Sequence, residues 1–386
     1  MASATGLNRR QFLRNTLMGG AGISLMGTPL WEAAAQIVNT PQVNLPNGVG
    51  LDDPMLVQLS INENPLGASR LAIEAVAKAM FKMNRYTFTT ELEEALAKHH
   101  GIPMDNIMIG TGSTVILNLV ALAAYWDRQG NTLTGFPSYP GLPVFTQQLG
   151  RQVKNVPLTN DWKLDLDAML KAIDKDTRLV SVCNPNNPTG QIVEPKALEK
   201  FLRAVPKDVL VCVDEAYIHF VDDPEYTSAI RLTQELPNVL VARTFSKAYG
   251  LGGVRVGYGV ANPDLIKRMW TFGLSDLNKS QLGIAAALGS LKDPEHVRRS
   301  VQVAQDGKKY LYAELEALGY EVVKSQTIFV PVKIGPNANT LVERLAERKV
   351  LIRQAFDMPG YIRISVGLPR ENEAFINAFK SVRSAL

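Results

Sequence analysis

The sequence has few of the residues that build disulfide frameworks or metal sites. It contains two cysteines, Cys183 and Cys212, and each lies in an apolar run (LVSVC and VLVCV). Because neither has the spacing of a disulfide or metal motif, buried free thiols are expected. The four histidines show no HExxH or comparable pattern (His99, His100, His219 and His296). The sequence therefore gives no indication of zinc.

Charge of one sign is also scarce. The formal net charge is +4, and no basic run is interleaved with aromatic residues, which argues against nucleic acid as a partner. Charged residues make up 20% of the chain and hydrophobic residues 46%, which excludes a disordered protein. The length of 386 residues suits two packed domains or one large α/β unit with an appendage, and neither an internal repeat nor a low-complexity tract is present.

The first 35 residues have the parts of an export signal. Adjacent arginines, Arg9 and Arg10, precede a Gly-rich apolar stretch (LMGGAGISLMG), and Ala33-Ala34-Ala35 offers a cleavage site. This order resembles a twin-arginine signal peptide, which would direct the protein to the periplasm or otherwise out of the cytoplasm. A frayed basic helix is the alternative. The apolar stretch is too short and too rich in glycine for a stable membrane span.

Short apolar runs that alternate with helical patterns predict an α/β fold. Several runs are rich in Val, Ile and Leu without alternation, as strands buried on both faces should be. The predicted strands are NIMIG, NTLTGF, RLVSVC, DVLVCVDE, VLVART and VGYGVA. Helical patterns such as STVILNLVALAAYW and EPKALEKFLRAV lie between them. This alternation favours a mostly parallel sheet flanked by helices.

The pattern changes past about residue 265, where long helical stretches precede short predicted strands (YEVVKS, IFVPVKI and YIRISVG). This favours a second, smaller α+β domain. Near the other end, Thr90 and Glu93 have the spacing of a helix capping box. The expected organisation is a signal peptide at 1–35, an N-terminal arm at 36–68, a large domain at 69–265 and a small domain at 266–386.

Polar clusters follow the predicted strands, where open α/β sheets bind their ligands. Residues 110–114 (GTGST) open a helix and suit a phosphate, although a plain helix cap explains them equally well. They lack the third glycine of G-x-G-x-x-G, so a nicotinamide dehydrogenase is a distant alternative. Residues 184–190 (NPNNPTG) follow the next apolar strand, where an ordinary Pro/Asn turn is the alternative.

Two ionisable residues also end predicted strands. Asp214 closes VLVCV, where a carboxylate costs free energy unless a cation or donor meets it. It is a candidate partner for a protonated ring nitrogen, with a helix N-cap as the alternative. Lys247 follows VLVARTFS, and Arg255 lies eight residues further on. A lysine near polar partners can lose its proton and become an amine nucleophile, whereas a surface loop lysine is the alternative.

Taken in order, these clusters resemble the fold-type I pyridoxal-phosphate (PLP) enzymes, class I/II aminotransferases, and most closely the histidinol-phosphate aminotransferase group. Residues 60–67 (SINENPLG) resemble that group's N-terminal segment, and the resemblance runs from about residue 58 to 367. It implies a large PLP-binding domain with a mostly parallel seven-stranded sheet, a smaller α+β domain, pyridoxal 5'-phosphate as cofactor, and a homodimer with shared active sites.

The resemblance also implies roles for the residues around the cofactor ring. Lys247 would carry PLP as a Schiff base and move the substrate proton. Asp214 would keep the pyridine nitrogen protonated, which makes the ring an electron sink. Asn187 and Tyr217 would donate to the phenolic oxygen. Tyr139 would stack on the ring, with a turn aromatic as the alternative.

Further implied contacts involve the two anionic groups. The cofactor phosphate would be bound by Gly112, Ser113, Thr244, Ser246 and Arg255, and by Tyr86 across the dimer interface. Arg363 would bind the substrate α-carboxylate, because strand alternation in YIRIS puts it on one face with Ser365. An exposed strand-edge arginine is the alternative. Arg353 and Asn64 are further substrate-binding candidates.

These features predict a transaminase that moves an amino group between an L-amino acid and a 2-oxo acid. An aromatic or other L-amino acid donor is expected, because histidine biosynthesis is cytoplasmic and an export signal fits it badly. Decarboxylation, racemisation and C–C lysis on the same scaffold are alternatives, since the same residues serve them. A non-catalytic binding protein that has kept the fold is a further alternative.

Overall fold

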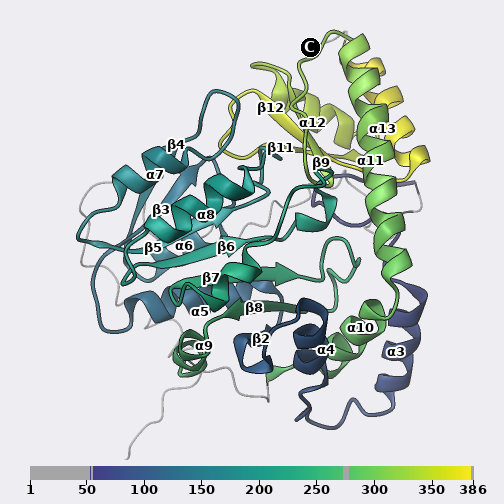
Figure 1. Ribbon diagram of the computed structural model, residues 1–386. Coiled ribbons are helices and arrows are strands. Elements are labelled where there is room, and N and C mark those ends of the chain that lie inside the picture. The colour runs from purple at the N-terminus through teal and green to yellow at the C-terminus, as the bar shows by residue number, and fades with distance from the viewer. Residues whose placement is uncertain (1–52, 54, 273–277, 384–386) are drawn as a thin grey trace, which may run out of the picture. The chain divides into compact units, whose positions relative to one another are not determined.

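The computed structural model describes residues 53, 55–272 and 278–383 (Figure 1). The predicted signal peptide at 1–35 lies outside these residues, as does most of the predicted arm before residue 55. Within the described part of the chain, no helix is both long and apolar enough to cross a membrane.

A seven-stranded sheet confirms the predicted α/β fold, with the order β2-β8-β7-β6-β5-β3-β4. Only β8 is antiparallel to its neighbours. The sequence pattern missed the edge strand β4, whose largely polar segment QVKNVP has no apolar run. In sheet order the strands are β2 (Ile107–Gly110), β8 (Gly257–Ala261), β7 (Val239–Thr244), β6 (Leu210–Asp214), β5 (Thr177–Cys183), β3 (Asn131–Phe136) and β4 (Gln152–Pro157).

Helices bury both faces of this sheet (Figure 1). Cys212 and Leu240 point to one face, and Val211 and Val241 point to the other, because side chains alternate along a strand. The first face packs on α5 (Ser113–Tyr125), α6 (Gly141–Gln148) and α9 (Pro263–Trp270). The second packs on α4 (Glu91–His100), α7 (Leu166–Ala172), α8 (Pro195–Ala204) and α10 (Gln281–Leu291). Burial on two sides explains the uninterrupted apolar runs.

A second core gathers the C-terminal elements around the antiparallel sheet β11-β12-β9. The pair β1-β10 is parallel and brings the N-terminal segment to this core. The elements are β1 (Val57–Gln58), β9 (Phe329–Lys333), β10 (Val350–Leu351), β11 (Arg353–Gln354), β12 (Tyr361–Ser365), α11 (Pro294–Ala317), α12 (Ala338–Ala346) and α13 (Pro369–Val382). The boundary near residue 265 stays a prediction.

Two local expectations were wrong. Residues 320–325 form no strand but make one isolated bridge, Val322 with Val332, beside a strand in which Pro331 has no N–H to donate. Thr90 makes no side-chain cap bond, because its backbone (φ −104°, ψ 5°) departs from the extended conformation of an N-cap residue; its hydroxyl donates to Glu94 Oε1 at 2.7 Å. The remaining helical segments are α3 (Arg70–Met80) and the 3₁₀ turns η1 (Met104–Asn106), η2 (Ile218–Phe220) and η3 (Ala229–Gln234).

Residues 59–64 run between the two cores. The backbone N–H of Ser365 in β12 donates to Leu59 O at 2.8 Å, and further along, Lys247 Nζ donates to Asn62 O at 2.9 Å. This segment therefore touches both the strand of Arg363 and the loop after β7.

Candidate active site

The register of the sheet brings the predicted motifs to one edge. Cys183, the last residue of β5, pairs with Asp214 at the end of β6. Thr244, at the end of β7, pairs with Gly257, the first residue of antiparallel β8, which also pairs with Gly110. The loops that follow β2, β5, β6 and β7 consequently start side by side, as expected for ligand binding in an open α/β sheet.

The first helix after β2 offers a site for a doubly charged anion. Helix α5 begins at Ser113 without a side-chain cap bond, so its first N–H groups remain available. Gly112 has φ +87°, and a Cβ there would lie 2.4 Å from Arg255 Nη2. The guanidinium therefore occupies space that only glycine leaves free. Thr244 Oγ1 donates to Ser246 Oγ at 2.9 Å, which adds hydroxyl groups at the neighbouring strand end.

The amine of Lys247 is held by backbone carbonyl groups. Nζ donates to Asn62 O at 2.9 Å and to Ile61 O at 3.2 Å. Burial, followed by the positive charges of Arg363 and Arg255, lowers the pKa of Lys247 to about 8. A lysine with such a pKa is partly neutral near neutral pH, as an amine nucleophile or base must be.

Asp214 is a buried carboxylate, and its Oδ1 accepts a hydrogen bond from the backbone N–H of Ala216 at 3.1 Å. Burial raises its pKa to about 6, and the adjacent Glu215 adds to the rise. Glu215 itself is neutralised by Arg243, whose Nε lies 2.8 Å from Oε2. Among the described residues Asp214 forms no ion pair, so its position fits a cationic ring nitrogen.

Arg363 is 2% exposed and forms no ion pair with any described residue. Its Nη1 donates to Asn187 Oδ1 at 2.6 Å and its Nη2 to Ser60 O at 3.0 Å, while Nε has no partner in the described chain. Burial, with a contribution from Arg353, lowers its pKa to about 9. A buried cation without a counter-ion fits the binding of a substrate anion.

Not all of the other predicted site residues lie beside Lys247, Asp214 and Arg363. Burial, followed by the negative charge of nearby Asp214, raises the pKa of the Tyr139 phenol. Arg353 pairs with Arg363 across β11 and β12, is half-buried, and has an unpartnered Nε. Tyr86 is 74% exposed and meets none of them within this chain. Asn64 uses its amide on Ala248 O and Ser300 Oγ, behind Lys247.

The sequence reasoning missed residues that hold this site together. Asn62 donates from Nδ2 to Tyr217 Oη at 2.9 Å, and Ser365 Oγ donates to Asn62 Oδ1 at 3.0 Å. Ser60 supplies the backbone carbonyl for Arg363. All three lie in motifs that were recognised, SINENPLG and YIRIS, but no pattern indicates which polar member of a motif faces inward.

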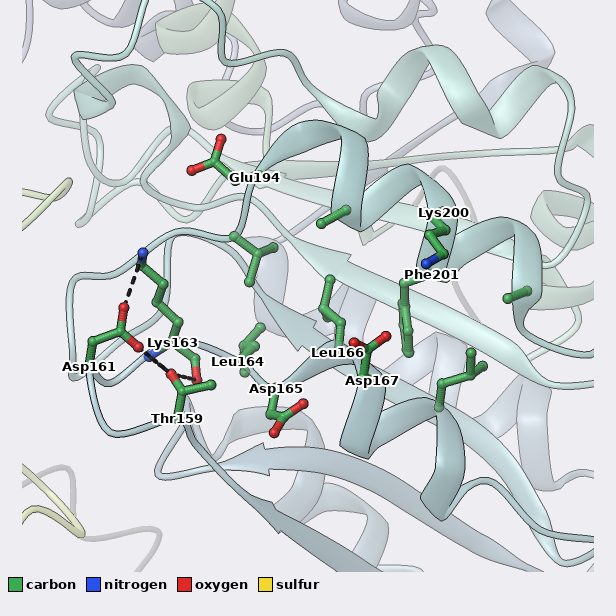
Figure 2. Close-up of a pocket in the computed structure, with 14 residues that line it drawn as sticks. Thr159, Asp161, Lys163, Leu164, Asp165, Leu166, Asp167, Glu194, Lys200 and Phe201 are labelled. Carbon is green, nitrogen blue, oxygen red and sulfur yellow. Dashed lines mark hydrogen bonds and ion pairs between the residues drawn. The ribbon is translucent and has the colours of Figure 1, made fainter.

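A separate cavity of about 350 Å³ lies between the 159–167 segment and α8 (Figure 2). Leu164, Leu166 and Phe201 line it, and none of the predicted site residues does. At its rim Lys163 pairs with Asp161 at 3.1 Å, so these charges already have partners. Among the described residues, no cluster of three or more His, Cys, Asp or Glu side chains is arranged for a metal ion. The strand ends remain the candidate active site.

Comparison with known proteins gives consistent matches. The sequence matches the family model "Aminotransferase class I and II" over residues 54–379. It is 36% identical to histidinol-phosphate aminotransferase 2 of Pseudomonas fluorescens over 372 residues, which cover 95% of this chain and 99% of that one. It is 37% identical to histidinol-phosphate aminotransferase of Symbiobacterium thermophilum, over 93% of this chain and 99% of that one.

Solved structures are similar over most of the chain. Histidinol-phosphate aminotransferase from Sinorhizobium meliloti, in complex with pyridoxal-5'-phosphate, superposes with a TM-score of 0.80 at 27% identity, covering 85% of this chain and 90% of that one. L-threonine-O-3-phosphate decarboxylase from Porphyromonas gingivalis has a TM-score of 0.74 at 24% identity and covers 85% of this chain and all of that one. The second likeness concerns the fold alone.

Proposed function

Because the chain belongs to the class I and II aminotransferases and is a transaminase with pyridoxal 5'-phosphate as its cofactor, we propose that Lys247 binds this cofactor covalently and that Arg363 holds the anionic group of the amino donor. One observation carries the proposal. A buried amine with a lowered pKa lies among a carboxylate without an ion pair, Asp214, and an arginine without a counter-ion among the described residues.

Bound PLP withdraws electrons from the α-carbon of the substrate, which allows the α-proton to leave. The neutral amine of Lys247, which the substrate amine would displace from the cofactor, would then take that proton and return it. Asp214 stabilises positive charge on the ring nitrogen. Arg363 fixes the substrate carboxylate, which orients the α-carbon toward Nζ.

The phosphate is held by the chain's own donors at the start of α5. Arg255 supplies two N–H groups in a planar fork, and the hydroxyls of Thr244 and Ser246 lie at the neighbouring strand end. The free N–H groups at Ser113 complete the cradle. Borohydride reduction followed by peptide mapping tests the covalent assignment. A pyridoxyl label on Lys247 is expected, and a label elsewhere would contradict the proposal.

The donor we propose is an L-amino acid, aromatic or otherwise. Two rings lie close to the guanidinium of Arg363, Phe329 at 5.2 Å and Phe356 at 5.7 Å between guanidinium carbon and ring centroid. An apolar side chain of the amino donor would therefore contact these rings beside the carboxylate site. A panel of amino donors, with histidinol phosphate among them, would be read by the spectral change of the bound cofactor. Reaction with histidinol phosphate alone would refute the amino-acid donor.

We also propose a homodimer in which Tyr86 reaches the phosphate of the partner's cofactor. Support comes from a strip of exposed apolar side chains, with Phe81 91% exposed, Met83 60%, Tyr86 74% and Phe88 73%. Such a patch is unusual on a free surface and is typical of an interface. Light scattering should show a dimer, and Phe88→Glu should weaken it. A wild-type monomer at micromolar concentration would contradict the assignment.

Export through the twin-arginine pathway is proposed from the sequence of residues 1–35 alone. A reporter fused to residues 1–40 should leave the cytoplasm. The double substitution Arg9→Lys with Arg10→Lys should hold it back. A reporter that stays inside the cell in both forms would remove the claim.

A further inference from the structure

The buried side chain of Asn62 connects three parts of the site. Its Nδ2 donates to Tyr217 Oη at 2.9 Å, its Oδ1 accepts from Ser365 Oγ at 3.0 Å, and its backbone oxygen accepts from Lys247 Nζ at 2.9 Å. The residue is 2% exposed and has a φ of +58°, in the left-handed region that most residues avoid. A costly backbone conformation held by several contacts indicates that its position is over-determined.

Ser365 decides which end of the Asn62 amide faces the phenol. The backbone N–H of Asn62 donates to Ser365 Oγ at 2.8 Å, and the hydroxyl hydrogen of Ser365 is then donated to Oδ1. Only the NH₂ end of the amide is left for Tyr217. The phenol oxygen therefore accepts from Asn62, and its own hydrogen stays available to another acceptor.

We infer that Asn62 is a positioning residue that keeps the hydroxyl of Tyr217 a hydrogen-bond donor toward the phenolic oxygen of PLP. This rests on the proposed function and on the role that the family resemblance implies for Tyr217, as a donor to that oxygen. The ring of Tyr217 is fixed by an edge-to-face contact with Phe329, at 5.3 Å between centroids, so only the hydroxyl hydrogen is left to orient. Ser365 lies two residues from Arg363 on the same face of β12, which ties this arrangement to the strand that binds the substrate.

The variant Asn62→Asp tests the inference, because it keeps the shape but replaces the donor with a carboxylate acceptor. The hydroxyl of Tyr217 then turns toward the new carboxylate and leaves the cofactor. A donor to the phenolic oxygen stabilises its negative charge and so lowers the proton affinity of the adjacent lysine-derived nitrogen. Without that donor, the pH midpoint of the visible absorbance of the loaded enzyme should rise by about one to two units.

Tyr217→Phe should shift this midpoint by a similar amount, and the double variant should shift it no further, since both changes remove the same hydrogen bond. The matched control is Asn106→Asp, which makes the same chemical change at a buried amide that bonds Ala261 O at 2.7 Å, remote in sequence from these motifs. That variant should lower the Tm without moving the midpoint.

Asn62→Gly keeps the left-handed backbone and removes the amide, so it serves if Asn62→Asp does not fold. The inference is overturned if the midpoint stays unchanged in the Asn62 variants, or if the shifts of Asn62→Asp and Tyr217→Phe add in the double variant. Borohydride labelling distinguishes a failure of the proposed function from a failure of the inference about Asn62. If Lys247 is not labelled, the proposed function is wrong. If Lys247 is labelled and the midpoint does not move, only the role of Asn62 is wrong.

Discussion

Replacing Asp214 with asparagine should make the cofactor-free enzyme more stable and the loaded enzyme less so. Asparagine keeps the oxygen that accepts the N–H of Ala216 but carries no charge. The pKa of Asp214 is raised from 3.8 to about 6, chiefly by burial. Two pKa units correspond to about 3 kcal/mol, which is the cost of ionising this carboxylate without a cation beside it.

The direction in which stability changes with pH follows from proton linkage. Because the folded-state pKa lies above the unfolded-state value, the folded protein binds more protons than the unfolded chain between about pH 4 and 6. The contribution of Asp214 to the free energy of unfolding therefore falls as pH rises through this window, and the cost is complete above about pH 6. Bound PLP reverses the balance, because a protonated ring nitrogen supplies the missing cation.

Urea unfolding of the cofactor-free proteins at pH 4.5 and pH 8 would measure the effect. The stability of Asp214→Asn minus that of the wild type should grow by about 2 kcal/mol between these pH values, because about 1 of the 3 kcal/mol is already present at pH 4.5. Addition of PLP should stabilise the variant less than the wild type. Asp174→Asn is a control whose difference should stay nearly constant between these pH values, because a hydrogen bond from Lys154 lowers the pKa of Asp174 and its carboxyl is largely ionised from pH 4.5 upward in both the folded and the unfolded chain. A difference that is constant with pH would refute the raised pKa of Asp214.

Three further outcomes are expected. Arg363→Ala should raise the KM for the amino donor about 100-fold with a smaller change in kcat, because it removes a charged, two-point contact with the substrate. An unchanged KM in steady-state kinetics would contradict this. Gly112→Ala should weaken PLP binding at least tenfold, since its Cβ would push the guanidinium of Arg255 away from the phosphate site. Gly101→Ala, at φ +66° with nothing within 4 Å, is the control for the strained backbone and should lower only the Tm. The rate of PLP incorporation into cofactor-free enzyme should rise about tenfold per pH unit up to about pH 8 and level off above it, because only neutral Lys247 reacts. A stopped-flow rate that keeps rising tenfold per unit between pH 8 and 10 would exclude the lowered pKa.

Local sequence patterns were sufficient to predict site residues whose role follows from their position at the end of a strand. The apolar runs around Cys183 and Asp214 become β5 and β6 because both faces are buried, and the polar residues at their ends meet through register alone. The edge strand β4 escaped detection, because an edge strand with exposed side chains has no apolar run to show. The predicted capping box at Thr90 is absent because the backbone of Thr90 does not take the extended conformation that aims an N-cap hydroxyl at the first turn.

The fold class, the order of the motifs, and the lysine and carboxylate at consecutive strand ends could be predicted from the sequence. These depend on the period of buried side chains and on contacts between neighbouring strands. Three features could be seen in the folded protein alone: Asn62, rather than Asn64, faces Tyr217, Ser365 orients it, and Arg363 is buried without a counter-ion among the described residues. Those contacts join residues 155 to 303 positions apart. The packing of one core on another sets their geometry, and no local pattern encodes it.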